Sequence, residues 1–305
     1  MREVKIPAFA KINLRLEILG KRPDGYHELR TIFQTVSLHD DLKLKRSKKT
    51  GIALRVEGNE SLSGQPVENN LVYRAVQALR TELQDDGGIE IELKKRIPAG
   101  RGLGGGSSDA AAAIIGYLRL RGKKVETARL MEMGASLGAD VPFFLQGGRA
   151  LGIGRGDEIY PLPDIATKAI LIVSPADIHV PTPEAYRWLN AQELTKSEEN
   201  HKLWKFCALS WSEQESGLLN DFESAVFQHH PRLDSIKRDL LRRGASEALL
   251  AGSGSAVIGV FPSPAKARRA AVGFTHDQTF VCETLSRAKY LRLTQGRSVR
   301  GASRV

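Results

Sequence analysis

The sequence is poor in cysteine, in long apolar runs and in clusters of metal-binding side chains. Its 305 residues include two cysteines, Cys207 and Cys282, which lie far apart and form no Cys-x-x-Cys pair. A disulfide framework and a structural zinc site are therefore both disfavoured. No stretch approaches the ~20 consecutive apolar residues that span a bilayer, and the N-terminus lacks the apolar core of a signal peptide. We assign no metal ligand to the protein and expect it to be cytoplasmic, with no membrane contact.

The excess of positive charge is concentrated at the end of the sequence. There are 45 Lys and Arg against 35 Asp and Glu, and residues 287–305 carry six basic residues and no acid. A Ser/Gly/Arg-rich end is more often a solvated tail than an arm that binds nucleic acid. We predict a flexible basic tail at residues 289–305 and no nucleic-acid partner. A basic nucleic-acid-binding protein is the alternative from another functional class.

The pattern of elements favours an α+β fold. Ile12, Leu14, Leu16 and Ile18 alternate with polar residues, which is the period of a half-buried strand, and Asn70 is a candidate helix cap. Strands and helices mix without strict alternation, so we expect mixed or antiparallel sheets with helices packed on one side. We place a domain boundary at 154–157, giving domains at 1–156 and 157–288. Further strands are predicted at 31–38, 42–45, 52–56, 89–93, 149–153, 169–173, 248–250 and 256–261, and helices at 70–83, 127–137, 183–190, 219–227 and 232–243.

The most unusual segment is a glycine-rich loop at residues 98–108. It contains five glycines in eleven residues and runs into an alanine-rich helix that we expect to begin at Ser107 or Ser108. Glycines let the backbone approach a ligand, and the start of a helix offers free N–H groups and the positive end of its dipole. The segment predicts a phosphate site, against the alternative of a flexible surface loop.

The glycine spacing does not fit the commonest nucleotide-binding motifs. Gly100, Gly102 and Gly105 satisfy Gly-x-Gly-x-x-Gly, but residues 123–126 lead into another helix where a dinucleotide-binding unit needs a second parallel strand. No Gly-Lys-Ser/Thr occurs, and the His-Arg-Asp and Asp-Phe-Gly elements of protein kinases are absent.

The segment resembles the second motif of the galactokinase, homoserine kinase, mevalonate kinase and phosphomevalonate kinase superfamily, Pro-x-x-x-Gly-Leu-Gly-Ser/Gly-Ser/Gly-Ser-Ala/Ser. Residues 10–14 resemble the first motif, and residues 251–255 resemble the third. The resemblance implies a two-domain small-molecule kinase, with the active site in the cleft between the domains and ATP as phosphoryl donor. Arg101 stands where a small residue is common, and we expect its side chain to point to solvent.

Further segments resemble one branch of that superfamily. They are Asp24-Gly-Tyr-His-Glu28, the triple glycine 104–106 and Gly138-Ala-Asp-Val-Pro-Phe143. This resemblance implies phosphorylation of the 2-hydroxyl of a cytidine diphosphate-linked methylerythritol, in the non-mevalonate route to isoprenoid precursors. A sibling kinase for another alcohol, of the homoserine or mevalonate type, is the alternative. The protein is expected to be a monomer or a homodimer.

Lys11 and Asp140 are the predicted catalytic residues. From the sequence alone, Asp140 could equally be a capping or turn residue, and Lys11 could be a solvated strand residue. The resemblance implies that Asp140 is the base that takes the hydroxyl proton. Lys11 is then its partner, which lowers the pKa of the hydroxyl and holds the base ionised.

The remaining site residues are assigned to the nucleotide and to the acceptor. Mg²⁺ should bridge the ATP phosphates, with Ser107 or Ser108 as hydroxyl contacts. Asn70 and Lys95 are expected near adenine, although an N-cap Asn and a solvated Lys are the alternatives. The expected ATP-binding residues are Pro98, Ala99, Gly100, Arg101, Gly102, Leu103, Gly104, Gly105, Gly106, Ser107, Ser108, Asn70 and Lys95. The expected acceptor-binding residues are Tyr26 and His27, which stack on and read cytosine, Tyr186 on its opposite face, and Asn13 and Thr182 on the erythritol or diphosphate.

Overall fold

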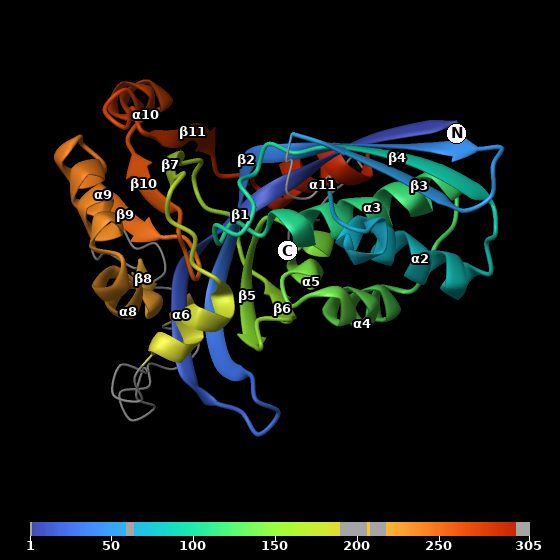
Figure 1. The fold of residues 1–305 in the computed structure, drawn as a ribbon, viewed down its shortest axis with the longest axis horizontal. Helices are drawn as coiled ribbons and strands as arrows, with labels where there is room; N and C mark the ends of the chain where they lie inside the picture. The colour runs from blue at the N-terminus through green and yellow to red at the C-terminus, as the bar shows by residue number, and fades with distance from the viewer. Residues whose placement is uncertain (1, 59–63, 190–205, 208–217, 297–305) are drawn as a thin grey trace, which may run out of the picture.

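Figure 1 shows the computed structural model of the chain, which describes residues 2–58, 64–189, 206–207 and 218–296. Two β-sheets, each covered by helices, form the two halves of the molecule. This arrangement confirms the predicted α+β class.

The first sheet is mixed and contains the two longest strands. Its described strands are β1 (Glu3–Lys21), β2 (His27–Ser47), β3 (Ile52–Glu57), β4 (Gly88–Lys94), β5 (Arg149–Gly154), β6 (Glu158–Pro161) and β8 (Leu219–Asn220). The strand order is β3-β4-β2-β1-β8, with β5 paired to β2 and β6 to β5. The strands predicted at 31–38 and 42–45 are parts of one strand, β2.

The pairing of β1 with β2 is antiparallel and irregular. Its register shifts between Phe9 and Lys11 and again between Asn13 and Arg15. Such irregularities re-aim side chains and are common beside active sites. Lys11 and Asn13 both lie on the segment of β1 between these two shifts.

Helices cover one face of the first sheet (Figure 1). They are the 3₁₀ turn η1 (Val67–Asn69), α2 (Leu71–Leu83), α3 (Gly105–Arg121), α4 (Thr127–Leu137) and α5 (Val141–Gln146). α3 is the most buried of these because it packs against β1 and β2 as well as against α2 and α5. Its side chains at Ile114 and Tyr117 are fully buried. α3 begins at Gly105, two residues before the earlier of the predicted starts.

The second sheet is antiparallel, in the order β11-β7-β10-β9. It consists of β7 (Ala169–Pro175), β9 (Glu247–Leu250), β10 (Val257–Phe261) and β11 (Asp277–Glu283). The helices of this half are α6 (Thr182–Trp188), α8 (Phe222–His229), α9 (Pro231–Arg242) and α10 (Pro264–Ala271). The helix predicted at 219–227 is wrong at its start, since residues 219–220 form β8. The last residue of the helix predicted at 183–190 lies outside the described residues.

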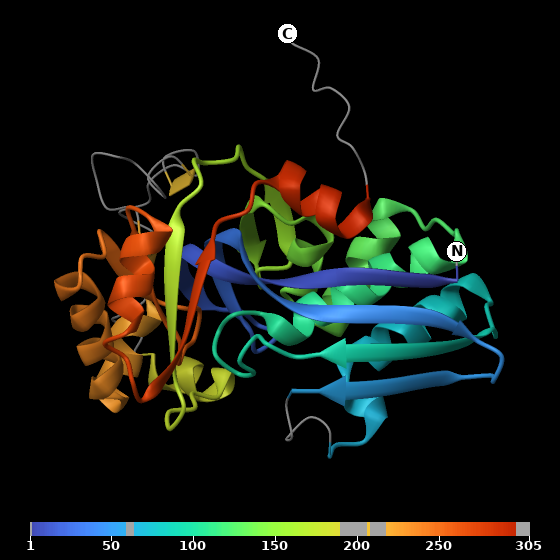
Figure 2. The ribbon, with the colours of Figure 1, turned by 90° about the horizontal axis from the view of Figure 1, so that it is seen from above.

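The two sheets share a core. Ile12 of β1 packs with Ile172 of β7 and Ile258 of β10, and all three side chains are fully buried. In Figure 2 the strands of the second sheet run across the long strands of the first. β1 therefore lies at the junction of the two halves, where both can contribute to one site.

The chain crosses between the halves at places that the sequence did not reveal. The turn at 154–157, where we predicted a boundary, joins β5 to β6 within the first sheet, so this sheet extends to Pro161. The helix α11 (Arg287–Gln295) returns to the first half, where Tyr290 is buried. The prediction of a tail is therefore wrong for residues 289–295, and residues 297–305 lie outside the described part. Within the described residues, no helix is long and apolar enough to cross a membrane.

Candidate active site

The glycine loop between β4 and α3 has a fixed backbone. Gly100, Gly102 and Gly104 have φ angles of 65°, 77° and 71°, a region that favours glycine. A Cβ on Gly102 would lie 1.8 Å from the carbonyl oxygen of Ala251 in the third glycine-rich segment. The loop is also tied to β1, because the Lys11 N–H donates to the Leu103 carbonyl at 3.0 Å. These contacts argue against the alternative of a flexible surface loop.

The first turn of α3 leaves its N–H groups open. Gly104 is the N-cap and provides no capping side chain, and the first hydrogen bond runs from Ser108 N–H to the Gly104 carbonyl at 2.9 Å. The N–H groups of the first three helical residues therefore have no partner within the helix. Together with the helix dipole they form a site for an anion.

The two serines of this turn differ in accessibility. Ser107 lines the cleft, and its Oγ lies 3.5 Å from where a Cβ on Gly138 would be, two residues before Asp140. The Ser108 hydroxyl is buried and donates to the Phe9 carbonyl at 2.6 Å. Of the two predicted hydroxyl contacts, only Ser107 faces the cleft.

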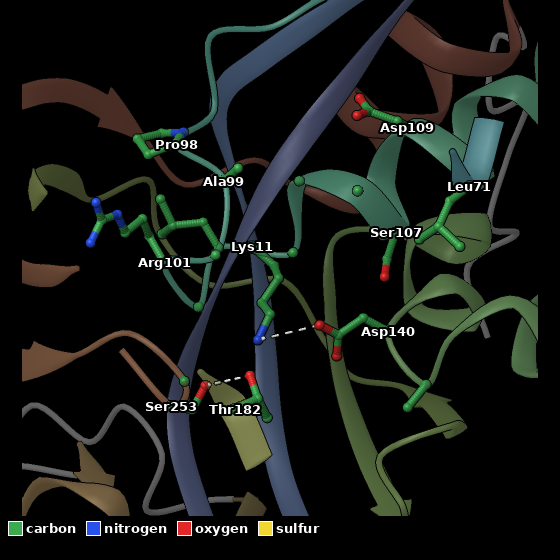
Figure 3. A pocket seen from close by; sticks show the side chains of 18 of the residues that line it. Lys11, Leu71, Pro98, Ala99, Arg101, Ser107, Asp109, Asp140, Thr182 and Ser253 are labelled. Carbon is green, nitrogen blue, oxygen red and sulfur yellow. Dashed lines mark hydrogen bonds and ion pairs between the residues drawn. The ribbon is translucent and has the colours of Figure 1, made fainter. Parts of the chain in front are cut away.

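Lys11 and Asp140 face each other across the cleft (Figure 3). The Lys11 ammonium lies 3.6 Å from the Asp140 carboxylate and donates to Asn13 Oδ1 at 2.7 Å. Lys11 is 5% exposed, so it is not a solvated strand residue. Asp140 precedes α5 but its side chain makes no capping hydrogen bond, so it does not act as a capping residue of this helix. The Asn13 amide donates in turn to Thr31 Oγ1 at 2.7 Å, which fixes its orientation.

A cleft of about 840 Å³ joins these features. This volume suits small-molecule ligands. Every predicted site residue lines the cleft except Ser108 and His27. One end of the cleft is formed by the glycine loop, the start of α2 and β3. It is called the nucleotide end hereafter, because the residues that the sequence predicts for ATP lie there. The other end is formed by the β1–β2 hairpin, the β5–β6 turn and α6, and it is called the acceptor end after the residues predicted for the acceptor.

At the nucleotide end, Asn70 and Lys95 both have structural partners. Asn70 Oδ1 accepts from the Val72 N–H at 2.9 Å, so the predicted N-cap is confirmed. Lys95 is buried and donates to Asp40 and to Asp109, each at 2.5 Å, so it is not a solvated lysine. Burial raises the pKa of Asp109 well above its usual value, against the opposing effect of Lys95. No pattern in the sequence indicates that Asp40 and Asp109 pair with this lysine.

At the acceptor end, His27 and Tyr186 stack on each other. Their ring centroids are 4.5 Å apart with an angle of 18° between the planes. Tyr26 and Tyr186 line the cleft, whereas His27 lies outside the lining. Burial, and then the charge of Lys21, lower the pKa of His27 below its usual 6.5. The structure thus brings the two tyrosines to one cleft but directs the His27 ring against Tyr186.

Three further residues at or near the cleft make contacts that the sequence did not indicate. The Arg155 guanidinium carbon lies 5.0 Å from the centroid of the Tyr26 ring. Ser253 Oγ is hydrogen-bonded to Thr182 Oγ1 at 2.9 Å (Figure 3). Arg101 donates to Ser255 Oγ at 2.6 Å and to the Ala176 carbonyl at 3.3 Å, so the expectation that it points to solvent is wrong. Its side chain instead links the glycine loop to the second half.

Known proteins are similar to this chain over most of its length. The chain matches the family models "GHMP kinases N terminal domain" over residues 70–148 and "GHMP kinases C terminal" over 203–276. It is 44% identical over 301 residues to the 4-diphosphocytidyl-2-C-methyl-D-erythritol kinase of Solibacter usitatus, covering 96% of this chain and 92% of that protein. The protein of the same name from Thermodesulfovibrio yellowstonii is 38% identical over 283 residues, covering 91% and 96%.

Solved structures are also similar to this chain, at lower sequence identity. A crystal structure of a 4-(cytidine 5'-diphospho)-2C-methyl-D-erythritol kinase matches with a TM-score of 0.80 and 32% identity, covering 92% of this chain and 99% of that chain. The homoserine kinase of Cytophaga hutchinsonii matches with a TM-score of 0.69 and 21% identity, covering 94% and 95%. The second likeness shows a shared fold alone.

Proposed function

The chain belongs to the GHMP kinase family, among its 4-diphosphocytidyl-2-C-methyl-D-erythritol kinases, and we propose that Lys11, Asp140 and the glycine loop carry out its reaction. The protein uses ATP to phosphorylate 4-diphosphocytidyl-2-C-methyl-D-erythritol in isoprenoid precursor synthesis. The products are the 2-phosphate and ADP. The observation that carries the residue assignment is the Lys11–Asp140 pair, 3.6 Å apart in the same cleft as the open start of α3.

We assign ATP to the nucleotide end. The N–H groups at the start of α3 would bind the phosphates, and the backbone of the loop from Pro98 to Gly104 would contact them directly. Adenine would lie in the slot lined by Leu54, Val56 and Leu71. The Asn70 side chain keeps its amide N–H₂ for the base, since its oxygen caps α2. Lys95 has two of its three donors on carboxylates, which leaves one for the nucleotide.

Mg²⁺ is proposed to accompany the ATP phosphates. Among the described residues, no group of three or more His, Cys, Asp or Glu is arranged to hold a metal. Mg²⁺ commonly keeps several waters and binds largely through substrate phosphates, so a sparse protein shell fits it. The Ser107 hydroxyl would be its protein contact. When bound, the ion would neutralise phosphate charge.

Asp140 would take the proton of the acceptor hydroxyl as that oxygen attacks the γ-phosphorus. The new O–P bond forms while the bond from the γ-phosphorus to the β,γ-bridging oxygen breaks, and ADP leaves. Lys11 would stabilise the negative charge that develops on the attacking oxygen. Asn13 holds the Lys11 ammonium in place through its 2.7 Å hydrogen bond.

The acceptor is assigned to the opposite end. Tyr26 and Tyr186 would stack on cytosine, and Thr182 and Asn13 would contact the erythritol or diphosphate, as all four line the cleft. His27 would act on the base through its stacking on Tyr186.

An ADP-release assay tests the function. The purified protein with ATP should form ADP with 4-diphosphocytidyl-2-C-methyl-D-erythritol and not with homoserine or mevalonate. Turnover on homoserine or mevalonate alone would overturn the assignment and favour a sibling kinase.

We also propose that the protein works without nucleic acid. Arg287, one of its C-terminal cations, donates to the carbonyls of Gly147 and Arg149, so part of the basic excess has a structural use. Filter binding of RNA and DNA at two salt concentrations should detect no tight, salt-sensitive complex. The monomeric or dimeric state and the cytoplasmic location stay predictions.

A further inference from the structure

The acceptor carries a diphosphate, and a cationic side chain beside a bound diphosphate strengthens its hydrogen bonds. This inference therefore rests on the proposed function. Five cationic side chains line the cleft among the described residues: Lys11, Arg55, Lys95, Arg101 and Arg155. Their positions decide which of them can serve the acceptor end.

Four of these cations interact with other groups of the protein or lie at the nucleotide end. Lys11 is paired with Asp140, and Lys95 lies between two buried carboxylates. The Arg101 guanidinium is held by Ser255 and the Ala176 carbonyl. Arg55 belongs to β3 at the nucleotide end and pairs with Glu57 at 3.0 Å.

Arg155 is held at the acceptor end in a defined orientation. It lies in the turn between β5 and β6, and its neighbour Tyr26 lies between β1 and β2, at the tip of their hairpin. Its Nε and Nη2 donate to Asp157 Oδ2 at 3.0 Å and 2.5 Å, and its guanidinium carbon lies 5.0 Å from the centroid of the Tyr26 ring. Within the described residues, Nη1 makes no hydrogen bond, and the side chain is 32% exposed. The guanidinium is therefore oriented by a carboxylate and a ring while one nitrogen remains open.

The other groups around Tyr26 cannot supply this charge. Burial and the charge of Lys21 lower the pKa of His27 below 6.5, so its ring is mostly neutral at pH 7. Arg22 is paired with Asp24 at 3.1 Å and with Glu28 at 2.5 Å, and it does not line the cleft. Lys21, the other cation of the hairpin, does not line the cleft, and the charges of Asp24 and Glu28 are negative and would repel a diphosphate.

We propose that Arg155 is a specificity-determining residue for the acceptor, whose free Nη1 binds the diphosphate while the face of its guanidinium packs on the Tyr26 ring. Arginine suits this role because it binds phosphate oxygens through N–H groups and also stacks on aromatic rings. Tyr26 then serves both the base and the cation that binds its phosphates.

The test compares three ligands that differ only in phosphate content. Binding of cytidine, CMP and CDP to Arg155→Met is measured by calorimetry, with Arg22→Met as the control that removes a nearby arginine outside the cleft. We expect the Kd of CDP to rise about tenfold or more in Arg155→Met, because a charge-assisted hydrogen bond is lost, while the Kd of cytidine changes little. In turnover assays KM for the acceptor should rise, with kcat and KM for ATP unchanged. Arg22→Met should leave all of these values near those of the unaltered protein.

The outcomes separate the proposal from its premise. If the affinities for cytidine and CDP fall equally, Arg155 only supports the Tyr26 ring. If the affinity for CDP is unchanged, Arg155 takes no part in recognition. Either result overturns the proposal. Because these measurements need no turnover, they stand apart from the ADP-release assay. If that assay fails while the CDP effect is seen, the fault lies in the proposed acceptor and not in the role of Arg155.

Discussion

The two ends of the cleft are built in different ways. The part of the nucleotide end that is proposed to bind phosphates is formed largely by backbone: one continuous loop, three glycines with positive φ and the N–H groups of a single helix. The acceptor end is formed by side chains from three separate places, with Tyr26 on the hairpin, Arg155 on a turn and Tyr186 on α6. At the first end the chemistry depends on where the main chain can go, whereas at the second it depends on which side chains tertiary packing brings together.

This difference implies different responses to mutation. Within the glycine loop, removing a side chain should cost little unless the change alters the backbone. Removing one from the acceptor end should weaken the acceptor and leave ATP unaffected. Lys11 and Asp140 lie between the two ends and should affect the chemical step itself.

The largest effect is expected where the two ends meet. Asp140→Asn keeps the shape of the side chain but cannot take the hydroxyl proton, so kcat should fall by about 10²- to 10⁴-fold. KM for ATP should stay near its original value, because the phosphate-binding loop is elsewhere. Steady-state kinetics with both substrates would check this. Near-normal turnover would show that another group is the base.

A second prediction tests whether the nucleotide end depends on backbone. Gly102→Ala places a Cβ 1.8 Å from the Ala251 carbonyl at a φ of 77°, which the loop cannot accept without moving. We expect a loss of roughly 1–3 kcal/mol in stability or ATP affinity, the usual range for an overpacked position. Thermal unfolding with and without ATP, together with calorimetry, would measure both.

Gly106→Ala is the matched control for that change. A Cβ there would meet its nearest neighbour, Leu71 Cδ1, at 3.6 Å, and Gly106 is already within a helix. It should bind ATP within a few-fold of the original affinity. Equal damage from the two substitutions would argue against a special backbone at Gly102.

A third prediction addresses the side chains of the acceptor end. Tyr26→Ala should raise KM for the acceptor by roughly ten- to hundredfold, since stacking of a base on an aromatic ring contributes about 1–3 kcal/mol. Tyr26→Phe keeps the ring and should restore most of the affinity. KM for ATP should be the same in all three proteins. A parallel rise in KM for ATP would mean that the two ends are not independent.

The smallest expected effect concerns the protonation of His27. An NMR titration should give a pKa below 6.5 for this ring, and Tyr186→Ala, which removes part of its cover, should bring the pKa back up. The unfolded chain binds this proton more tightly than the folded protein. His27 therefore reduces stability as the pH falls below 6.5 and has no such effect well above it. If the pKa of His27 is the same in Tyr186→Ala as in the unaltered protein, another neighbour buries the ring.

The same contrast explains what could be predicted from the sequence. The glycine loop and the helix behind it are contiguous, so residues 98–108 could be assigned to one site from their order alone, although Ser108 is buried and does not line the cleft. Lys11 and Asp140 needed the resemblance to a known family, because neither residue has a local signal that distinguishes it from a solvated lysine or a capping aspartate. The helices predicted at 70–83 and 127–137 match α2 (Leu71–Leu83) and α4 (Thr127–Leu137) to within one residue at each end.

What could not be predicted depends on contacts between distant residues. Arg155 lies in a Gly-Arg-Gly-Asp stretch whose local signal is that of a turn. Lys95 meets Asp40 from β2 and Asp109 from α3, a pairing that no sequence period encodes. Arg101 is bound by Ser255, 154 residues away along the chain.

The helix α11 supports the active site, but it is synthesised long after the residues that it supports. Tyr290 donates its hydroxyl to the Phe144 carbonyl and lays its ring against Gly147, while Arg287 binds the next turn of chain. These contacts brace the helix that follows Asp140. On the ribosome, domains fold largely in the order in which they emerge. The segment bearing the base is thus translated early but gains this brace only after residue 290 has left the exit tunnel.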